Sequence, residues 1–317
     1  IHNLKYQGIY PPSIMRDIIG LPQELFDKGN LECDGCVNYM KSGMVYADHI
    51  TTVSPSYAQE ITYPYFGEGL DGYIRDNGEK VTGIINGLDV DVYNPETDPY
   101  IKRQYSVANA RAGKRENKDA LRAELGLRIK RGVPLIAMVT RLVEDKGLDL
   151  VTRIMDELVD DDVQLVLVGT GDAGYENAFR ELARRHPTKV SANITFNEAL
   201  AHKVYAAADM FLMPSRYEPC GLSQLIALRY GAIPIVRETG GLKDTVHPFD
   251  KYSKQGNGLT FPNFNAHELL FTTKRAMGYY EDTALWDILV RNAMTSDYSW
   301  DRSAEAYLNL YKKVLQQ

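Results

Sequence analysis

Along residues 133–261, short apolar runs alternate with segments in which apolar residues recur at the spacing of one helix face. Short apolar runs rich in β-branched residues predict buried strands, and the amphipathic segments between them predict helices. The expected strands are 133–140, 163–168, 194–196, 210–213 and 232–236. The expected helices are 147–158, 175–185, 198–207 and 222–230. This alternation predicts an α/β domain in which helices cover a parallel sheet, as in a Rossmann-like fold.

Residues 1–95 form a different block, rich in Tyr, Gly and Pro. Its clearest element is a strand at 49–53, which leads into Ser54 and Pro55. A serine N-cap followed by proline in the first turn is a typical helix start. Residues 98–130 are polar and charged, which is typical of a connection between domains.

These patterns predict three segments. We expect a first domain at 1–97, a second at 98–297 and a carboxyl-terminal helix within 298–317 that crosses back to the first domain. The last segment is predicted to be helical because one apolar face contains Ala304, Tyr307, Leu308 and Tyr311.

Composition narrows the classes of protein that fit. The 317 residues suit two domains, and 44% hydrophobic with 25% charged residues excludes a disordered chain. A net charge of -6 without a basic run argues against nucleic-acid binding. No apolar run approaches the roughly 20 residues that span a bilayer, so we expect no membrane association.

Three cysteines are too few for a disulfide framework, which favours a reducing compartment. We therefore expect a cytoplasmic protein, or a plastid one if the source is a plant. Cys33 and Cys36 form a lone C-x-x-C with no second pair and no histidine at ligand spacing, so we expect neither a zinc site nor a redox role for them. No cofactor is expected. Cys220 is expected to pack at a helix start.

Ligands of open parallel sheets collect beyond the carboxyl ends of the strands, so the loops there are the candidates for chemistry. The loop at 140–147 carries Arg141 and Lys146 beside a predicted helix start, which favours an anion site for a phosphate or diphosphate. The alternative is a pair of solvated surface cations. The loop at 214–224 carries Glu218, either as a functional carboxylate or as a helix cap.

After Glu218 the predicted helix begins, and its first backbone N–H groups, at Gly221, Leu222 and Ser223, lack helical acceptors. They are candidate donors to an anion. A further loop, 239–242, contains Gly240 and Gly241, which would let the backbone approach a ligand closely.

Residues 169–174 match G-x-G-x-x-G, with Gly171 as the second glycine. The motif follows the second strand of the unit, and the position about 20 residues on is Ile194 or Thr195, not the acid that a ribose contact requires. NAD binding is therefore not expected. A tight turn and a nucleotide-facing glycine remain equal alternatives for Gly171.

Several stretches together match the signatures of one family. They are Thr140-Arg141-Leu142 with Lys146-Gly147-Leu148, residues 214–225, residues 229–246, Ile1-His2-Asn3-Leu4, Thr52-Val53-Ser54-Pro55 and residues 83–89. The chain resembles the retaining GT-B glycosyltransferases of the bacterial glycogen synthase and plant starch synthase family. This resemblance implies two Rossmann-like domains. Full-length relatives begin with a half-domain carrying a Lys-x-Gly-Gly-Leu loop that this sequence lacks, so we expect the first domain to be incomplete here.

The resemblance implies transfer of glucose from ADP-glucose to the non-reducing end of an α-1,4-glucan, with retention of configuration. It implies that Arg141 and Lys146 bind the donor diphosphate, with Gly221, Leu222 and Ser223 adding donors. Electrostatic stabilisation of the leaving diphosphate would make a metal ion unnecessary.

The resemblance also assigns the sugar and base contacts. Glu218 would hold hydroxyls of the donor glucose, His2 would line the sugar site, and Asn86 would contact the same sugar from the other domain. Phe196 stands where relatives usually carry a tyrosine that stacks on adenine, and its ring still offers an aromatic face.

Alternatives stay open at this stage. One is a catalytically incompetent fragment that binds nucleotide or glucan without transfer; another, ranked last, is a phosphorylase on the same architecture. Glu218 is expected to position the donor, although a nucleophilic role like that of retaining glycosidases is the alternative. The choice between ADP- and UDP-glucose, the glucan length preference and the oligomeric state are not decided by the sequence.

Overall fold

The computed structural model describes residues 1–316, which divide into two compact units. Unit 1 contains Ile1–Asn86 and the carboxyl-terminal segment from Ser303 onward, and unit 2 contains Gly87–Arg302. The polar stretch suggested a boundary near residue 97, whereas the contacts place residues 87–97 with unit 2. One contact of this stretch within unit 2 is the hydrogen bond that the Leu88 N–H donates to the Tyr298 carbonyl at 2.7 Å.

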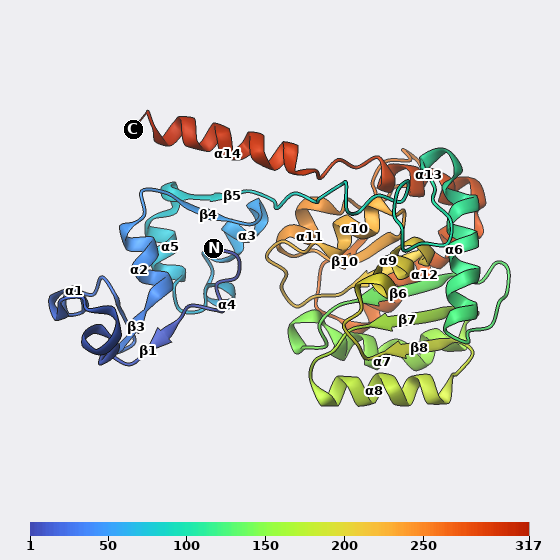
Figure 1. Cartoon of the computed structure of the whole chain (residues 1–317), viewed down its shortest axis with the longest axis horizontal. Helices are drawn as coiled ribbons and strands as arrows, with labels where there is room; N and C mark the ends of the chain where they lie inside the picture. Colours follow the sequence, from blue (N-terminus) through green and yellow to red (C-terminus); the bar gives the residue numbers. More distant parts are fainter. Residues whose placement is uncertain (317) are drawn as a thin grey trace. The chain divides into compact units, whose positions relative to one another are not determined.

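The core of unit 2 is a six-stranded parallel sheet with strand order β11-β10-β9-β6-β7-β8 (Figure 1). The strands are β6 (Leu135–Val139), β7 (Gln164–Val168), β8 (Val190–Asn193), β9 (Met210–Met213), β10 (Ile233–Arg237) and β11 (Leu259–Phe261). The chain builds outward from β6 to β8 and then returns to place β9 on the other side of β6. The strand order therefore reverses between β6 and β9, which creates a topological switch point.

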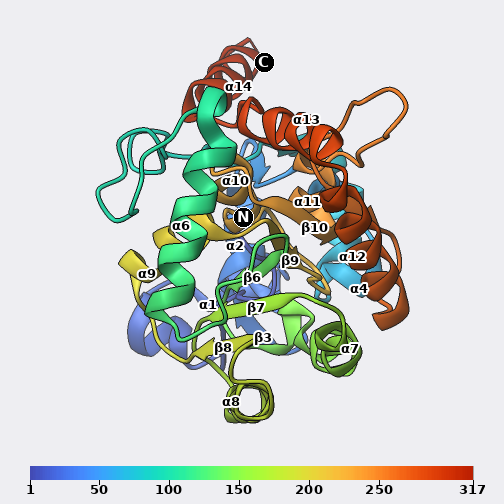
Figure 2. The same cartoon turned by 90° about the vertical axis from the view of Figure 1, so that its right-hand side faces the viewer.

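Helices cover both faces of this sheet, with α6 and α9 on one face and α7 and α12 on the other (Figure 2). They are α6 (Ala110–Glu124), α7 (Leu148–Asp160), α8 (Ala173–Arg185), α9 (Glu198–Ala207), α10 (Ser223–Arg229), α11 (Gly240–Thr245), α12 (Ala266–Glu281) and α13 (Thr283–Met294). Two 3-10 turns, Val107–Asn109 and Glu144–Lys146, precede α6 and α7. Because both faces are covered, every residue of β7 and β9 is buried, as parallel strands usually are.

Four of the five expected strands are confirmed, as are the four expected helices, apart from shifts of a few residues at their ends. The strand expected at 194–196 is wrong. β8 lies earlier and pairs with β7 from Leu165↔Val190 to Val168↔Asn193. The β-branched pair Ile194 and Thr195 misled the prediction, because these residues lie beyond the last residue that β7 can pair with.

Residues 98–130 are not only a connection. They contain α6, which buries Lys114, Lys118 and Arg122 at 5%, 7% and 1% exposure. The polar sequence did not predict a buried helix, because charged residues are usually exposed. These cations can be buried because each has polar partners: Arg122, for example, donates to the Gln164 side chain and to the Val133 carbonyl, both at 2.7 Å.

Unit 1 contains a small antiparallel sheet, order β1-β3-β2, and a parallel pair, β4 and β5. The strands are β1 (Ile9–Tyr10), β2 (Glu32–Cys33), β3 (Cys36–Asn38), β4 (Ile50–Thr52) and β5 (Val81–Gly83). The helical elements are η1 (Met15–Ile19), α1 (Gln23–Asp27), α2 (Tyr39–Tyr46), α3 (Pro55–Glu60), α4 (Pro64–Gly67), α5 (Asp71–Asp76), η2 (Gly78–Lys80) and most of α14 (Trp300–Val314).

The expected start of α3 is confirmed: Ser54 caps it by accepting the Tyr57 N–H at 2.9 Å, and Pro55 occupies the first turn. The carboxyl-terminal helix α14 joins this unit through Ser303, whose hydroxyl donates to the Ile85 carbonyl at 2.7 Å. Among residues 1–316, no helix has the length and apolar character needed to cross a membrane.

Candidate functional site

The loops that follow β6 and β9 meet at the switch point of the unit 2 sheet. The Arg216 N–H donates to the Asp145 carbonyl at 2.9 Å, and the Tyr217 hydroxyl donates to the Asp145 carboxylate at 3.0 Å. A Cβ on Gly147 would lie 2.0 Å from the Pro214 carbonyl oxygen, so only glycine permits this approach. Two segments about 70 residues apart in sequence are thereby held in backbone contact.

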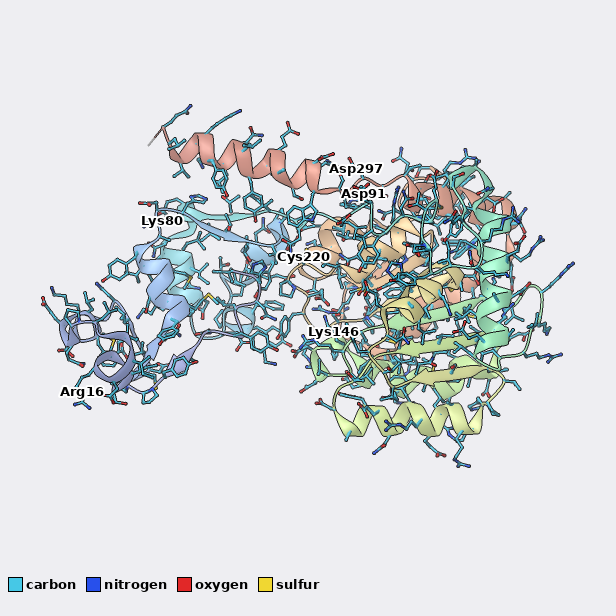
Figure 3. The ribbon with its side chains drawn as sticks, viewed as in Figure 1. Arg16, Lys80, Asp91, Lys146, Cys220 and Asp297 are labelled. Atoms are coloured by element: carbon cyan, nitrogen blue, oxygen red, sulfur yellow. The ribbon has the colours of Figure 1, made fainter. Side chains whose placement is uncertain are left out.

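This contact brings Lys146 and Glu218 together, and Figure 3 labels Lys146 on its loop. The Lys146 Nζ lies 2.5 Å from Glu218 Oε2, and the Ser215 hydroxyl donates to the same oxygen at 3.0 Å. Glu218 is only 7% exposed. Its other oxygen, Oε1, accepts no hydrogen bond within the described part of the chain. The site thus presents a buried carboxylate oriented by a cation, with one oxygen left for a ligand.

Arg237, the last residue of β10, secures the loop that carries Glu218. Its Nε donates to the Ser215 carbonyl at 2.9 Å, and its Nη2 donates to the Arg216 carbonyl. The Arg216 side chain lies over the Phe264 ring at 4.3 Å and forms ion pairs of 3.4 Å with Glu144 and 3.6 Å with Asp149. Contacts from β10 and from the segments that follow β6 and β11 therefore limit how far the loop can move.

The backbone at Gly240 and Gly241 lies close to another segment, and that segment is the loop that carries Glu218. A Cβ on Gly240 would lie 2.1 Å from the Glu218 carbonyl oxygen, and one on Gly241 would lie 2.1 Å from that of Cys220. The Gly241 N–H also donates to the Glu218 carbonyl at 3.1 Å. Their immediate structural role is to seat the Glu218 loop against the start of α11.

Gly171 occupies a similar position between the loops after β6 and β7. A Cβ there would lie 2.3 Å from the Leu142 carbonyl oxygen, and the flanking Asp172 N–H donates to that oxygen at 2.7 Å. The Gly171 N–H itself donates to the Glu176 carboxylate at 3.0 Å. These contacts favour the tight-turn interpretation of the glycine motif.

Arg141 follows directly on the loop after β6 and is exposed, without an ion pair or side-chain hydrogen bond to any residue of 1–316. Phe196, after β8, is 95% exposed, so its ring is available to a ligand. Leu222 is 48% exposed, and the Ser223 hydroxyl donates weakly to the Val139 carbonyl at 3.4 Å. Gly221, with a φ of +72°, turns the chain into α10.

His2 and Asn86 lie in unit 1, where His2 is exposed and Asn86 half-buried. Their predicted sugar contacts stay predictions. Cys33 and Cys36 face each other across the β2–β3 turn as free thiols, and Cys220 is buried. Residues 1–316 hold no group of three or more His, Cys, Asp or Glu side chains placed to bind a metal ion.

Sequence reasoning missed Asp145, Ser215 and Arg237, which orient the site. Arg237 carried a usable signal, because it follows the predicted strand at 232–236 and so lies at the carboxyl edge of the sheet. The roles of Asp145 and Ser215 depend on contacts between distant loops, which no local pattern encodes.

Comparison with known proteins shows the family and the fold of the chain. Residues 1–76 match the family model described as starch synthase catalytic domain, and residues 119–277 match that of glycosyl transferases group 1. The chain is 53% identical over 316 residues to a glycogen synthase from Bacillus cereus (strain B4264) and 50% identical over 315 residues to one from Desulforamulus reducens. These alignments cover 100% and 99% of this chain and 66% and 65% of the relatives, so the chain spans slightly less than two thirds of their length.

Among solved structures, the catalytic domain of starch synthase IV from Arabidopsis thaliana, bound to ADP and acarbose, superposes with a TM-score of 0.93 at 35% identity. The match covers 100% of this chain and 66% of that one. The predicted α/β fold of the GT-B kind and the resemblance to glycogen and starch synthases are confirmed. Because the group 1 model covers slightly more than half of its residues, this chain belongs to the family of glycosyl transferases group 1.

Proposed function

We propose that this chain is the larger part of a glycogen synthase, which transfers glucose from ADP-glucose to the non-reducing end of an α-1,4-glucan with retention of configuration. The observation that carries the proposal is 53% identity along the whole chain to a glycogen synthase. The starch synthase IV structure bound to ADP supports adenosine diphosphate as the nucleotide. The layout of unit 2 is consistent with it, since ligands of such sheets bind at the switch point.

In this proposal Arg141 and Lys146 bind the diphosphate of the donor. When the bond between the anomeric carbon and the diphosphate oxygen breaks, negative charge grows on the leaving group, and fixed cations lower the barrier by stabilising that charge. They supply the charge that a metal ion supplies in other transferases. A phosphate oxygen of the leaving ADP accepts the proton of the acceptor hydroxyl as the new bond forms.

Glu218 holds the donor sugar. Its Oε2 is occupied by Lys146 and Ser215, so Oε1 is the oxygen that accepts hydrogen bonds from sugar hydroxyls. An ammonium at 2.5 Å lowers the nucleophilicity of a carboxylate, which favours positioning over covalent attack. The same ion pair links the two halves of the donor, because Lys146 contacts both the diphosphate and the residue that holds the glucose.

The exposed Phe196 ring stacks on adenine, and the backbone N–H groups of Gly221, Leu222 and Ser223 complete the diphosphate contacts. Stacking on a phenyl ring discriminates weakly between bases, so any preference for ADP over UDP is expected to be modest at this residue.

The test is calorimetric titration of the 317-residue chain with ADP and with UDP. Arg141→Ala should weaken ADP binding about tenfold or more, because a charge-assisted hydrogen bond to phosphate is lost. The matched control is Arg153→Ala, which removes another exposed arginine of unit 2, on α7. Equal effects of the two substitutions, or no ADP binding by the chain, would contradict the assignment of the donor site.

Two further measurements separate the parts of the proposal. Phe196→Ala should weaken ADP binding while Phe271→Ala, which removes another exposed ring (69% exposed, on α12), should not. Transfer is then measured as incorporation of labelled glucose from ADP-glucose into glycogen. ADP binding without incorporation would favour the alternative of a chain that binds nucleotide without transferring glucose.

A further inference from the structure

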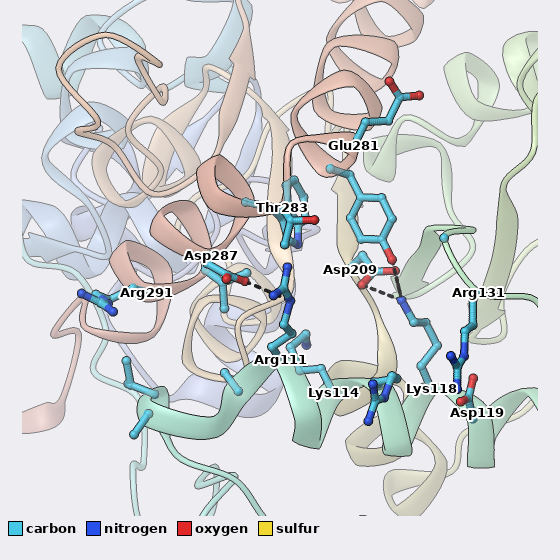
Figure 4. Close-up of a pocket in the computed structure, with 18 of the residues that line it drawn as sticks. Arg111, Lys114, Lys118, Asp119, Arg131, Asp209, Glu281, Thr283, Asp287 and Arg291 are labelled. Carbon is cyan, nitrogen blue, oxygen red and sulfur yellow. Dashed lines mark hydrogen bonds and ion pairs between the residues drawn. The ribbon is translucent and has the colours of Figure 1, made fainter.

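A cavity of about 600 Å³ lies at the amino edge of the unit 2 sheet. It is lined by one face of α6, by the end of α12 and the start of α13, and by the residues that precede β6 and β9 (Figure 4). Gly132 precedes β6 and Asp209 precedes β9 at this edge of the sheet. Lys146 follows β6 and Glu218 follows β9 at the opposite edge. The cavity is therefore separate from the candidate donor site, and its volume is in the range of small-molecule pockets.

The floor of the cavity is built from buried, ordered cations. The Lys118 Nζ lies 2.9 and 2.7 Å from the two carboxylate oxygens of Asp209 and 2.9 Å from the Tyr280 hydroxyl. The Lys114 Nζ donates to the carbonyls of Tyr230 at 2.8 Å and of Ala206 at 3.2 Å. Lys114 thus has polar contacts but no ion pair with any described carboxylate.

The walls add more positive charge. Seven of the lining residues are Lys or Arg and four are Asp or Glu. Arg111 faces Asp287 at 3.6 Å (Figure 4). Arg115, Arg131 and Arg291 are exposed at the mouth of the cavity and have no ion pair or side-chain hydrogen bond to any residue that the structure describes. They come from α6, from the turn before β6 and from α13, so three separate segments contribute uncompensated charge to one cavity.

The buried cations at the floor and the exposed arginines at the mouth repel one another, and an anion bound between them removes that cost. Burial lowers the pKa of Lys114 to about 7, so the ammonium form at the floor would be stabilised by negative charge in the cavity. Guanidinium groups match phosphate oxygens in geometry and remain charged at every physiological pH.

We propose that this cavity is a second anion site, which binds a small phosphate compound carrying two or more negative charges. The surplus of three cations over acids sets the charge of the ligand, and the volume argues for a small molecule rather than a peptide. Thr283 and Glu281 at the rim offer a hydroxyl and a carboxylate to the hydroxyl groups of a sugar ester. The proposal does not depend on the function proposed above.

The test is calorimetric titration of the 317-residue chain with pyrophosphate and with fructose 6-phosphate at physiological ionic strength. We expect binding to the cavity that saturates below about 1 mM. Pyrophosphate can also occupy the candidate donor site, so the cavity component is the one that remains in Arg141→Ala. The triple variant Arg115→Gln, Arg131→Gln, Arg291→Gln should weaken it at least tenfold. The control triple Arg153→Gln, Lys312→Gln, Lys313→Gln removes the same charge from other exposed positions and should change it less than about twofold, because exposed distant charges are screened.

Binding must also persist in Arg141→Ala, which separates this cavity from the candidate donor site, and ADP binding must persist in the cavity triple. The tighter of the two probes identifies the source of the phosphate, an inorganic anion or a sugar ester. No saturable binding of either probe, equal weakening by the two triples, or loss in Arg141→Ala would each overturn the proposal. Near-UV circular dichroism of each variant checks that it is folded.

Discussion

Gly240→Ala is the sharpest test of how the Glu218 loop is built. Gly240 has a φ of +44°, and a Cβ at this position would lie 2.1 Å from the Glu218 carbonyl oxygen. That oxygen belongs to the backbone, so no side-chain rotation can relieve the contact. The substitution must either change the backbone at Gly240 or push the loop away from it.

The magnitude follows from two costs. An L-residue in the left-handed region costs about 1–2 kcal/mol, and forcing an extra methyl group into a packed site costs about 1–3 kcal/mol. We therefore expect Gly240→Ala to lower the free energy of unfolding by about 2–5 kcal/mol. Because the displaced carbonyl belongs to Glu218, the substitution should also disturb the pairing of this carboxylate with Lys146 and weaken ADP binding.

The matched control is Gly278→Ala. Gly278 lies within α12, and a Cβ there would meet no atom within 4 Å, so alanine should stabilise the helix by up to about 1 kcal/mol. The assay is urea unfolding of the three proteins with an ADP titration of each. If Gly240→Ala unfolds within about 0.5 kcal/mol of the parent and binds ADP equally well, the described contact between the two loops is wrong.

Three further predictions concern unit 2. Lys118→Met should cost about 3–5 kcal/mol in urea unfolding, because it leaves the buried carboxylate of Asp209 without its ion-pair partner; a loss below 1 kcal/mol would contradict this. Burial alone would raise the pKa of Asp98, but hydrogen bonds from neighbours that include Tyr230 hold this pKa below its usual value. The ionised Asp98 therefore stabilises the fold above about pH 4, and this stabilisation is lost as the pH falls through the lowered pKa. Tyr230→Phe should move this loss to higher pH, and unfolding midpoints from pH 7 to pH 3 that run parallel in both proteins would refute the link. Asn265→Ala removes the N-cap of α12 and should cost about 1 kcal/mol, measured as a lower thermal midpoint; an unchanged midpoint would count against the cap.

Much of unit 2 could be predicted from local pattern. After Gln164, β7 is a continuous apolar run because both faces of the strand are buried. Helices such as α7 repeat apolar residues every three to four positions because only one of their faces is buried. The loops that carry Lys146 and Glu218 could be chosen as candidates because a parallel sheet places the carboxyl ends of its strands at one edge. The charges of the residues and their positions directly after predicted strands were sufficient to choose these loops.

Only the tertiary structure determined which of those residues contact one another and which backbone atoms each glycine approaches. Lys146 and Glu218 are 72 positions apart, and their pairing depends on β9 lying beside β6, a choice made by the packing of the whole sheet. The same holds for α6, whose charged sequence predicts a solvated connection. Lys118 is buried there because Asp209, 91 positions away, supplies the opposite charge. Local sequence determines the period and polarity of an element, whereas the partner that satisfies a buried charge is known only once distant segments are packed together.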